Sequence, residues 1–364
     1  MTADDSGRRS ERDVLDAIEA RRRRPRRKVL DERVTLSHGA GGKSSHDLVE
    51  GIFVSELSNP LLEPLGDSAL LETGSGRLAF TTDSFVVRPL FFPGGDIGEL
   101  AVNGTVNDLA MSGARPLALS AGFIIEEGFP VADLLRIAGS MARAARAAGV
   151  PVATGDTKVV ERGNADGLYV NTSGVGVIDH GAELGPDAIR AGDRVLVSGP
   201  IGDHGMAVMI ARGDLELELE LESDTAPLNG LVEALLESGA EVHCLRDPTR
   251  GGLATVLAEL SLAAEVGVTL QESALPIRPE VNGACEILGI DPIYVANEGR
   301  LVAVVAPESA DKALAALRSD PLGREAAIIA EVTAEPPGLV ILETTLGGTR
   351  VVDMLAGDPL PRIC

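Results

Sequence analysis

The stretch RLAFTTDSFVVRPLFFPGGDIGELAVNGTVNDLAMSG, residues 77–113, contains both kinds of regular secondary structure. Residues 77–82 form a short apolar run that ends in the polar cluster Thr81-Thr82-Asp83-Ser84, which predicts a β-strand. Residues 97–112 show the three- and four-residue spacing of apolar side chains that is typical of a helix, and Gly113 is placed to end it. A strand followed by a helix favours an α/β fold.

The same alternation continues towards the C-terminus. It predicts helices over residues 131–148 and 204–212, strands over residues 168–178, 195–197 and 301–305, and a strand–loop–helix unit over residues 244–262. In the first of these helices, the side chains expected to face the core are Leu134, Leu135, Ala138, Met141 and Ala142. Gly, Pro and acidic residues cluster at 181–192, where we place a domain boundary. The expected segments are an extension (1–32), an N-terminal domain (33–185), a C-terminal domain (186–346) and a mobile tail (347–364).

Composition excludes several classes of function. The formal charge of −23 disfavours nucleic acid and anionic membranes as partners. No apolar run reaches the ~18 residues of a membrane-spanning helix, and no secretory signal precedes the first domain. Three cysteines, Cys244, Cys285 and Cys364, fit a reducing cytoplasm and argue against a disulfide framework. We therefore expect a cytoplasmic protein.

The first 31 residues differ from the rest, because they hold ten basic residues against seven acidic ones. The basic block 21–28 is either an interaction or targeting arm, or a disordered, solvated extension ahead of the first strand.

Acidic residues recur at the predicted ends of elements, next to glycine. They are Asp67, Asp83, Asp108, Asp156 and Asp247. Each one alone is explained by a turn or a helix cap, where Asp is common. Together they suit Mg²⁺, which prefers a few carboxylates combined with substrate phosphates and water.

Three basic or glycine-rich features could contact phosphate. The run His38–Ser44 includes Gly41, Gly42 and Lys43 but lacks the first glycine of a Walker A motif. It is therefore either a glycine-rich loop that presents backbone N–H groups to an anion, or a flexible segment before the first element of the fold. Lys158, close to Asp156, could balance phosphate charge or lie exposed on the surface. Arg250 precedes Gly251-Gly252 and a predicted helix, where it could meet a phosphate at the helix N-terminus.

The sequence ends in GDPLPRIC, residues 357–364, and the last residue is Cys364. Two prolines at alternate positions prevent a helix and favour a stiff, extended arm. Such an arm could carry the thiol into a cleft, or Cys364 could be incidental at a frayed end.

Taken together, the motifs resemble those of the HypE family of hydrogenase maturation factors, which belongs to the PurM-like superfamily of ATP-binding proteins. The resemblance runs from about Val34 to Cys364, and its most specific part is the terminal Pro-Arg-Ile-Cys. The other matching segments are HGAGG (38–42), TTDSFVV (81–87), FPGGDIG (92–98), NGTVNDLA (103–110), GDTKVV (155–160), GDHG (202–205), DPTRGG (247–252) and ANEG (296–299). Two departures are the basic extension, and Ser68 where relatives often carry a second acid.

The resemblance implies a carbamoyl dehydratase with two PurM-like α/β (α+β) domains, in which the mixed N-terminal sheets of two subunits pair in a homodimer. It implies that a HypF protein loads a carbamoyl group on Cys364, that ATP and Mg²⁺ drive its dehydration to a thiocyanate, and that the cyano group passes to iron held by a HypC–HypD complex.

The resemblance also implies roles for individual residues. Besides Cys364, the candidates for the base that removes the nitrogen protons are Glu272, which ranks first, Lys158 and His204. The implied metal ligands are Asp67, Asp83, Asp108 and Asp247. The implied nucleotide-binding residues are Gly41, Gly42, Lys43, Thr82, Asp83, Asn107, Asp156, Thr157, Lys158 and Arg250.

Two other classes of function stay open at this point. A small-molecule kinase or synthetase of the same superfamily would need no terminal cysteine, and a non-catalytic ATP-binding scaffold would tolerate loss of the metal-binding aspartates.

Overall fold

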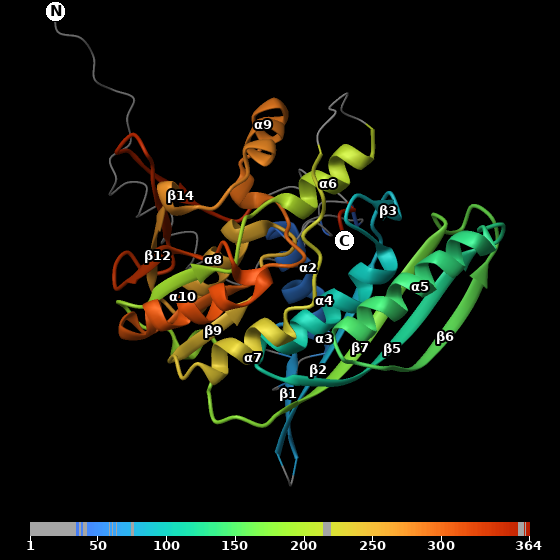
Figure 1. Ribbon diagram of the computed structural model, residues 1–364, viewed down its shortest axis with the longest axis horizontal. Helices are drawn as coiled ribbons and strands as arrows, with labels where there is room; N and C mark the ends of the chain where they lie inside the picture. Colours follow the sequence, from blue (N-terminus) through green and yellow to red (C-terminus); the bar gives the residue numbers. More distant parts are fainter. Residues whose placement is uncertain are drawn as a thin grey trace, which may run out of the picture.

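The computed structural model describes residues 34–35, 38, 42–57, 59, 61–62, 64–73, 76–213, 220–355, 360 and 362–364 (Figure 1). The predicted extension over residues 1–32 and the predicted ligand Gly41 lie outside these residues. Within them, no helix combines the length and the hydrophobicity needed to cross a membrane. Two sheets organise the fold, and the segment between Ile178 and Arg194 connects them. The domain limits drawn from the sequence stay predictions.

The N-terminal sheet has the strand order β1–β2–β7–β5–β6. In chain order the strands are β1 (Ala69–Thr73), β2 (Gly76–Phe85), β5 (Arg115–Glu126), β6 (Val152–Val160) and β7 (Leu168–Ile178). β5 and β6 are parallel and the other neighbours are antiparallel, so the sheet is mixed, as expected. The strands predicted at 77–82 and 168–178 are confirmed.

Helix α4 (Ile97–Met111) crosses one face of this sheet and confirms the helix predicted at 97–112 (Figure 1). It is buried around nearly its whole circumference, because it also contacts the C-terminal domain. Asp96 caps its start: one carboxylate oxygen accepts the backbone N–H groups of Gly98 at 2.8 Å and Glu99 at 3.2 Å. Gly113 follows the helix with φ +73°, as predicted.

Helix α5 (Val131–Ala147) lies on the same face of the sheet and is amphipathic, and its predicted inward face was right in part: Met141 is buried and Leu134 packs against the core, whereas Ala138 is exposed. Leu135 is 74% exposed, whereas Ile137 and Met141 are buried. The reason is the close approach of α5 to α4 at Gly98, where an added Cβ would lie 2.4 Å from the Ile137 carbonyl oxygen. This contact turns the Ile137 side of α5 inward.

The C-terminal sheet has the strand order β14–β13–β10–β12–β8–β11–β9. Its strands are β8 (Arg194–Val197), β9 (Val242–Arg246), β10 (Gly267–Gln271), β11 (Val302–Val305), β12 (Ala327–Thr333), β13 (Val340–Glu343) and β14 (Thr349–Val352). The helices of this domain are α6 (Asp203–Ala211), α7 (Asn229–Glu237), α8 (Gly252–Ala263), α9 (Pro279–Leu288) and α10 (Ala310–Ser319). These elements confirm the predictions at 195–197, 204–212, 244–262 and 301–305.

Shorter elements complete the described chain. They are α2 (Lys43–Leu48), η2 (Val49–Val54), α3 (Ser55–Leu57), β3 (Phe91–Phe92), β4 (Gly95–Asp96), η3 (Pro186–Ala188), η4 (Glu272–Ala274), η5 (Pro292–Tyr294), η6 (Pro307–Ser309) and η7 (Pro321–Gly323).

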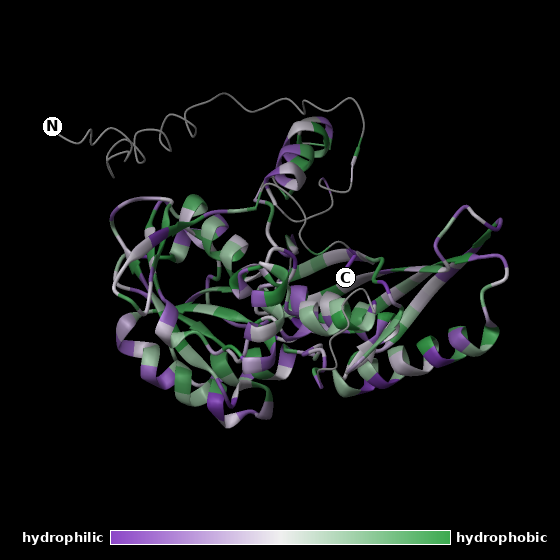
Figure 2. Ribbon diagram, turned by 90° about the horizontal axis from the view of Figure 1, so that it is seen from above, coloured by the Kyte–Doolittle hydropathy of each residue, from purple (hydrophilic) through white to green (hydrophobic). Residues whose placement is uncertain are grey.

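The predicted tail begins later than expected. Residues 349–352 form strand β14, and Gly347, with φ +82°, lies in the hairpin turn that joins it to β13. Only the chain beyond Val352 leaves the sheet. The C-terminus then lies between the two domains (Figure 2), where Leu360 and Ile363 are each 3% exposed within the core that includes α4 and α5.

Candidate active site

The C-terminal residues pair with the chain that follows β2. The N–H of Val86 donates to the carbonyl of Cys364 at 3.2 Å, and the N–H of Arg88 donates to the carbonyl of Arg362 at 3.1 Å. Arg362 is also ion-paired with Asp166. This antiparallel pairing holds Cys364, which is partly buried, against the core, so Cys364 is not a frayed end.

Arg250 contacts the terminal thiol. Its Nη2 donates to Cys364 Sγ at 2.8 Å. The turn between β9 and α8 places Arg250 there, and this turn needs glycine at Gly251 and Gly252, whose φ angles are +84° and +63°. Burial raises the pKa of the Cys364 thiol to about 12, although Arg250 acts in the opposite direction. In this position the sulfur is therefore a protonated thiol and a weak nucleophile.

Four acidic side chains converge, and one of them, Asp83, acts on the thiol: they are Asp83 on β2, Asp108 on α4, Asp247 directly after β9, and Asp67 before β1. Burial raises the pKa of each of them, and that of Asp247 reaches about 7. The pKa of Asp108 is raised well above its usual range by burial and then by the other three carboxylates, so all four interact. The structure thus brings together the four predicted metal ligands from distant parts of the sequence.

Arg246 and Arg250 offset only part of this negative charge. The Nε of Arg246 lies 2.8 Å from Asp67 Oδ2. Within the described residues, no three His, Cys, Asp or Glu side chains form a group that could hold a metal ion unaided. Mg²⁺ commonly takes one or two carboxylates and completes its shell with phosphate oxygens and water. The donor set therefore fits a Mg²⁺ ion that binds together with a phosphate group.

Glu298 is a site residue that the sequence prediction missed. It lies in the loop before β11, is 3% exposed, and its Oε1 has no hydrogen-bond partner among the described residues. Burial raises its pKa well above the usual range, and Asp247 and Asp83 raise it further. Its charge in turn raises the pKa of the Cys364 thiol. The available signal was the ANEG segment at 296–299, which contributed to the resemblance but was given no role.

His204 binds the tail through its ring. Its Nε2 lies 2.9 Å from the carbonyl oxygen of Ile363, and its Nδ1 lies 2.8 Å from Ser223 Oγ. A carbonyl can only accept, so Nε2 carries the proton. Burial lowers the pKa of His204 to about 4, which keeps the ring neutral, so Nδ1 is an acceptor. Both nitrogens are engaged, which speaks against the predicted role of His204 as a base.

Two family models match the chain. The N-terminal domain model of AIR synthase related proteins matches residues 65–178, and the C-terminal domain model matches residues 190–342. Carbamoyl dehydratase HypE of Rhizobium leguminosarum bv. viciae is 54% identical over 337 residues, which cover 92% of this chain and 96% of that protein. The chain belongs to the HypE family of carbamoyl dehydratases.

Two solved HypE structures are similar throughout. A HypE–HypF complex contains a chain that matches with a TM-score of 0.81 and 50% identity, covering 85% of this chain and 99% of that one. A HypE in complex with ATP matches with a TM-score of 0.77 and 46% identity, covering 91% and 100%. The predicted two-domain PurM-like fold is confirmed.

The structure does not bring Glu272, the first-ranked base for a HypE-type reaction, to the thiol. Its Oε2 accepts the backbone N–H of Thr345 at 2.7 Å and lies 3.1 Å from Thr345 Oγ1. Glu272 follows β10, which lies four strand positions from β9, and Asp247 follows β9. Four strand spacings amount to about 19 Å. Glu298 acts electrostatically on Cys364, whereas Glu272, which the prediction ranked first, does not feature among the groups that act on the thiol.

The predicted nucleotide ligands of the N-terminal sheet are divided between its two faces. Thr82, Asp156 and Lys158 project from the outer face, whereas Asp83 and Thr157 alternate to the other one. Lys158 Nζ donates to Asp156 Oδ2 at 2.6 Å on the exposed edge strand β6. β6 lies three strands from β2, or about 14 Å. Within one HypE-family chain, these residues therefore do not form a single site with Asp83.

Three further predicted ligands are occupied by contacts within the chain. Lys43 is ion-paired with Asp353. A Cβ on Gly42 would lie 2.2 Å from the Leu355 carbonyl oxygen, so this glycine permits close packing against the chain after β14. Asn107 is buried, its Nδ2 donates to the carbonyls of Ala226 and Glu298, and its Oδ1 accepts the N–H of Leu228. The structure speaks against direct nucleotide contacts by the side chains of Lys43 and Asn107, and it gives Gly42 a packing role.

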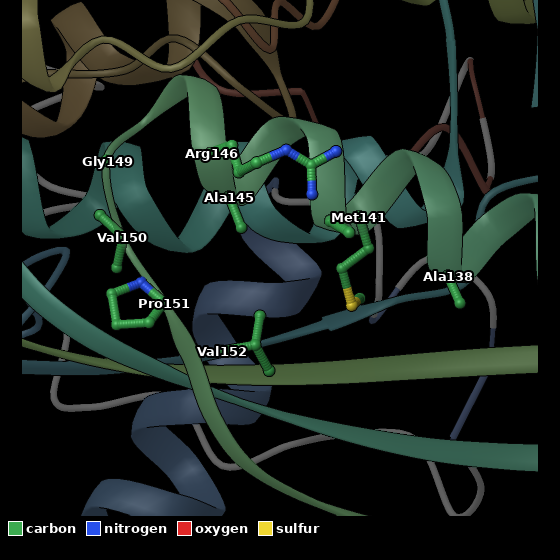
Figure 3. Close-up of a pocket in the computed structure, with 9 residues that line it drawn as sticks. Ala138, Met141, Ala145, Arg146, Gly149, Val150, Pro151 and Val152 are labelled. Atoms are coloured by element: carbon green, nitrogen blue, oxygen red, sulfur yellow. The ribbon is translucent and has the colours of Figure 1, made fainter.

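A cavity of about 720 Å³ adjoins the carboxylates on the side of Asp67. Its lining includes Asp67, Ser68, Met111, Arg246, Leu260 and Met354. A second hollow of about 580 Å³ lies between α5 and the start of β6 (Figure 3). All residues lining the second hollow are described, and Arg146 alone among them is charged. Of these two hollows, the first is lined by one of the four carboxylates, Asp67.

Proposed function

We propose that this protein uses ATP to dehydrate an S-carbamoyl group on its own Cys364 to a thiocyanate, which supplies cyanide ligands for the iron of nickel–iron hydrogenase. The observation that carries the proposal is the position of the C-terminal sulfur, which accepts a hydrogen bond from Arg250 and interacts with Glu298 and Asp83, two members of a group of five interacting acids. A small-molecule kinase would not need its own terminal thiol at this place. The names of the HypE relatives and the ATP complex of one of them support the same reaction.

The overall change converts Cys–S–C(=O)NH₂ and ATP to Cys–S–C≡N, ADP and phosphate. The carbamoyl oxygen attacks the γ-phosphorus and ADP leaves; the C–O bond then breaks as phosphate departs, and nitrogen loses two protons as the C≡N bond forms. Phosphoryl transfer of this kind depends on positioning and on stabilisation of phosphate charge. Arg250, donating to the sulfur, holds the reacting end of the tail.

Glu298 is proposed to accept a proton from the carbamoyl nitrogen. It is the buried carboxylate with a free oxygen near Cys364, and a base must lie within hydrogen-bond reach of the proton that it removes. The other predicted base, Lys158, projects from the outer face of the sheet and could reach the site only from a second subunit.

Asp67, Asp83, Asp108 and Asp247 are proposed to hold Mg²⁺ together with the phosphates, and the adjoining cavity to hold the rest of ATP. Changing Asp83→Asn removes a charged ligand, so the Mg²⁺ concentration for half-maximal ATP hydrolysis should rise about tenfold or more. Magnesium titrations of ATP hydrolysis measure this shift. Asp311→Asn, on the exposed start of α10, is the control and should leave the titration unchanged. An unshifted curve for Asp83→Asn would remove Asp83 from the ligand set.

The partners follow from the state of the thiol. A buried thiol with its pKa raised to about 12 by burial is a poor acceptor of a carbamoyl group, so the tail must leave the cleft to be loaded. We propose a HypF protein as the donor, because a related HypE forms a complex with HypF, and a HypC–HypD complex in the cytoplasm as the acceptor of cyanide.

A homodimer is proposed through the outer face of the N-terminal sheet. In the described chain this face carries apolar side chains that no other element covers, and they are Leu71, Leu78, Phe80, Ile124, Tyr169, Val175 and Val177. Phe80 and Ile124 are 47% and 45% exposed. A contiguous apolar face of this kind marks a protein–protein interface.

Placing a charge on this face should separate the subunits. We expect Phe80→Asp to be monomeric by light scattering, because burying an unpaired carboxylate at the interface is costly. Leu135→Asp is the control: Leu135 is also apolar and more exposed, but it projects from α5, and its variant should stay dimeric. A dimeric Phe80→Asp protein would place the interface elsewhere.

The central test is the intact mass of the protein after chemical carbamoylation of its thiol. Addition of Mg·ATP should remove the mass of one water from the carbamoylated chain. Release of phosphate without this change of mass would contradict the proposed reaction.

A further inference from the structure

The segment 222–226, here called the strap, crosses from one domain to the other beside the site. Ser223 N–H donates to the carbonyl of Pro93 in the N-terminal domain at 2.9 Å. Asp224 Oδ1 accepts the N–H of Glu298 in the C-terminal domain at 3.0 Å. Thr225 Oγ1 accepts from the buried amide of Asn103 at 3.2 Å. Consecutive residues of the strap therefore contact opposite sides of the active site.

Two glycines fix the position of the strap. A Cβ on Gly94 would lie 2.7 Å from the backbone nitrogen of Ser223, and a Cβ on Gly299 would lie 1.7 Å from the carbonyl oxygen of Asp224. No side chain fits in either place, so the strap is in direct backbone contact with both domains.

Ser223 begins a chain of directed hydrogen bonds that ends on the tail. Its Oγ accepts the N–H of Thr225 at 3.1 Å, which leaves its own proton for Nδ1 of His204. The ring then carries its proton on Nε2 and donates it to the carbonyl of Ile363, the residue before Cys364. The Ile363 carbonyl favours the same tautomer, so without the Ser223 hydroxyl the tautomer would depend on the tail alone.

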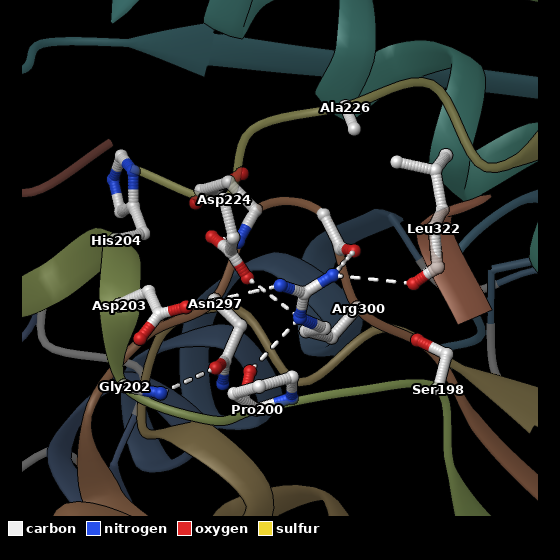
Figure 4. A network of polar contacts seen from close by, with 12 residues as sticks. Ser198, Pro200, Gly202, Asp203, His204, Asp224, Ala226, Asn297, Arg300 and Leu322 are labelled. Atoms are coloured by element: carbon white, nitrogen blue, oxygen red, sulfur yellow. Dashed lines mark hydrogen bonds and ion pairs between the residues drawn. The ribbon is translucent and has the colours of Figure 1, made fainter. Parts of the chain in front are cut away.

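Asp224, the next residue of the strap, contacts the part of the site that contains Glu298. Its side chain is fully buried, and besides accepting the Glu298 N–H it lies 3.5 Å from the Nε of Arg300 (Figure 4). Arg300 also donates to the carbonyl of Pro200 at 2.8 Å, and this anchors the loop between β8 and α6. The backbone of Glu298 is therefore tied to the residue next to Ser223.

We infer that Ser223 is a positioning residue for the dehydration: its hydroxyl fixes the tautomer of His204, and His204 holds the tail so that the carbamoylated sulfur faces Glu298. The inference rests on the proposed function and adds a residue that never touches the reacting atoms. Because Asp224 holds Glu298, the strap sets the distance between the tail-borne group and its base.

The test is a double-mutant cycle on the rate of water loss from carbamoylated full-length protein at saturating Mg·ATP. Ser223→Ala removes one hydrogen bond that orders the tail, so the rate should fall about tenfold, with the affinity for ATP unchanged. In a His204→Gln background, the amide can donate to the tail without help from Ser223. In that background, Ser223→Ala should lower the rate of water loss hardly any further, because Ser223 and His204 act through the same contact with the tail.

A purely structural role for Ser223 predicts the same loss of rate in both backgrounds, and that result would overturn the inference, as would an unchanged rate in Ser223→Ala. Nitrogen NMR of the histidine rings gives a second measurement: His204 should show one tautomer in the unaltered protein and a mixture in Ser223→Ala. Ser261→Ala removes another buried hydroxyl, one that donates to the carbonyl of Val266, and should change neither quantity. If the unaltered carbamoylated protein lost no water, the proposed function itself would fail.

Discussion

A Cys364→Ala variant should give no thiocyanate, and its mass should not change when Mg·ATP is added after carbamoylation. The reason is that the substituted sulfur is itself the substrate, and Arg250 holds it at the site. Binding of ATP should be unaffected, because Cys364 is neither one of the carboxylates nor part of the lining of the adjoining cavity. Intact mass spectrometry and equilibrium nucleotide binding together measure both expectations.

Cys285→Ala is the matched control for this experiment. Cys285 is buried in the middle of helix α9 and not on the C-terminal tail, so it does not compete for the carbamoyl group. This variant should lose water at the rate of the unaltered protein. Full dehydration by Cys364→Ala would show that the reaction uses another acceptor.

Glu298→Gln should lower the rate of water loss about 1,000-fold at saturating ATP, within the range typical of a lost general base. Single-turnover mass spectrometry of the carbamoylated protein measures this rate. The substitution preserves the shape of the side chain and the backbone contact to Asp224. Glu298→Asp retains a carboxylate at a shorter reach and should keep more of the rate than the glutamine variant.

The free energy of unfolding of Glu298→Gln shows whether a loss of rate comes from the missing base or from misfolding. The pKa of Glu298 is raised in the folded protein, so its contribution to stability is full at low pH and falls as the pH rises through the folded pKa. Replacing this buried acid with a neutral amide should leave the free energy of unfolding at pH 7 unchanged or higher. A glutamine variant that is stable and fully active would show that Glu298 is not the base.

Local sequence patterns predicted the strands and helices well, because apolar periodicity reports which face of an element is buried. Residue type and the family resemblance grouped Asp83, Asp108 and Asp247 as metal ligands, but not the geometry of the group, which depends on how α4 lies between the two sheets. The same patterns missed β14, a short edge strand without a clear apolar period. Thr82 and Asp83 are neighbours in sequence but point to opposite faces, which only the placement of β2 reveals.

Glu298 and Ser223 were missed for a different reason. Each lies in a loop between regular elements, where periodicity carries no information. Their positions depend on contacts with distant residues, Asp224 in one case and His204 in the other. Glu272 was favoured on its local surroundings alone, and the order of strands places it apart from the thiol.

The burial of Leu360 and Ile363 limits the fraction of time for which the terminal sulfur is exposed to solvent. Returning two such side chains to water costs about 1.5–3 kcal/mol each, so the extended state of the tail has an occupancy below about 1%. The thiol is then shielded from adventitious oxidants for nearly all of its lifetime. A carbamoyl donor must in turn offer its own apolar pocket to these two residues, and this requirement makes access to the sulfur selective for a protein that recognises the tail.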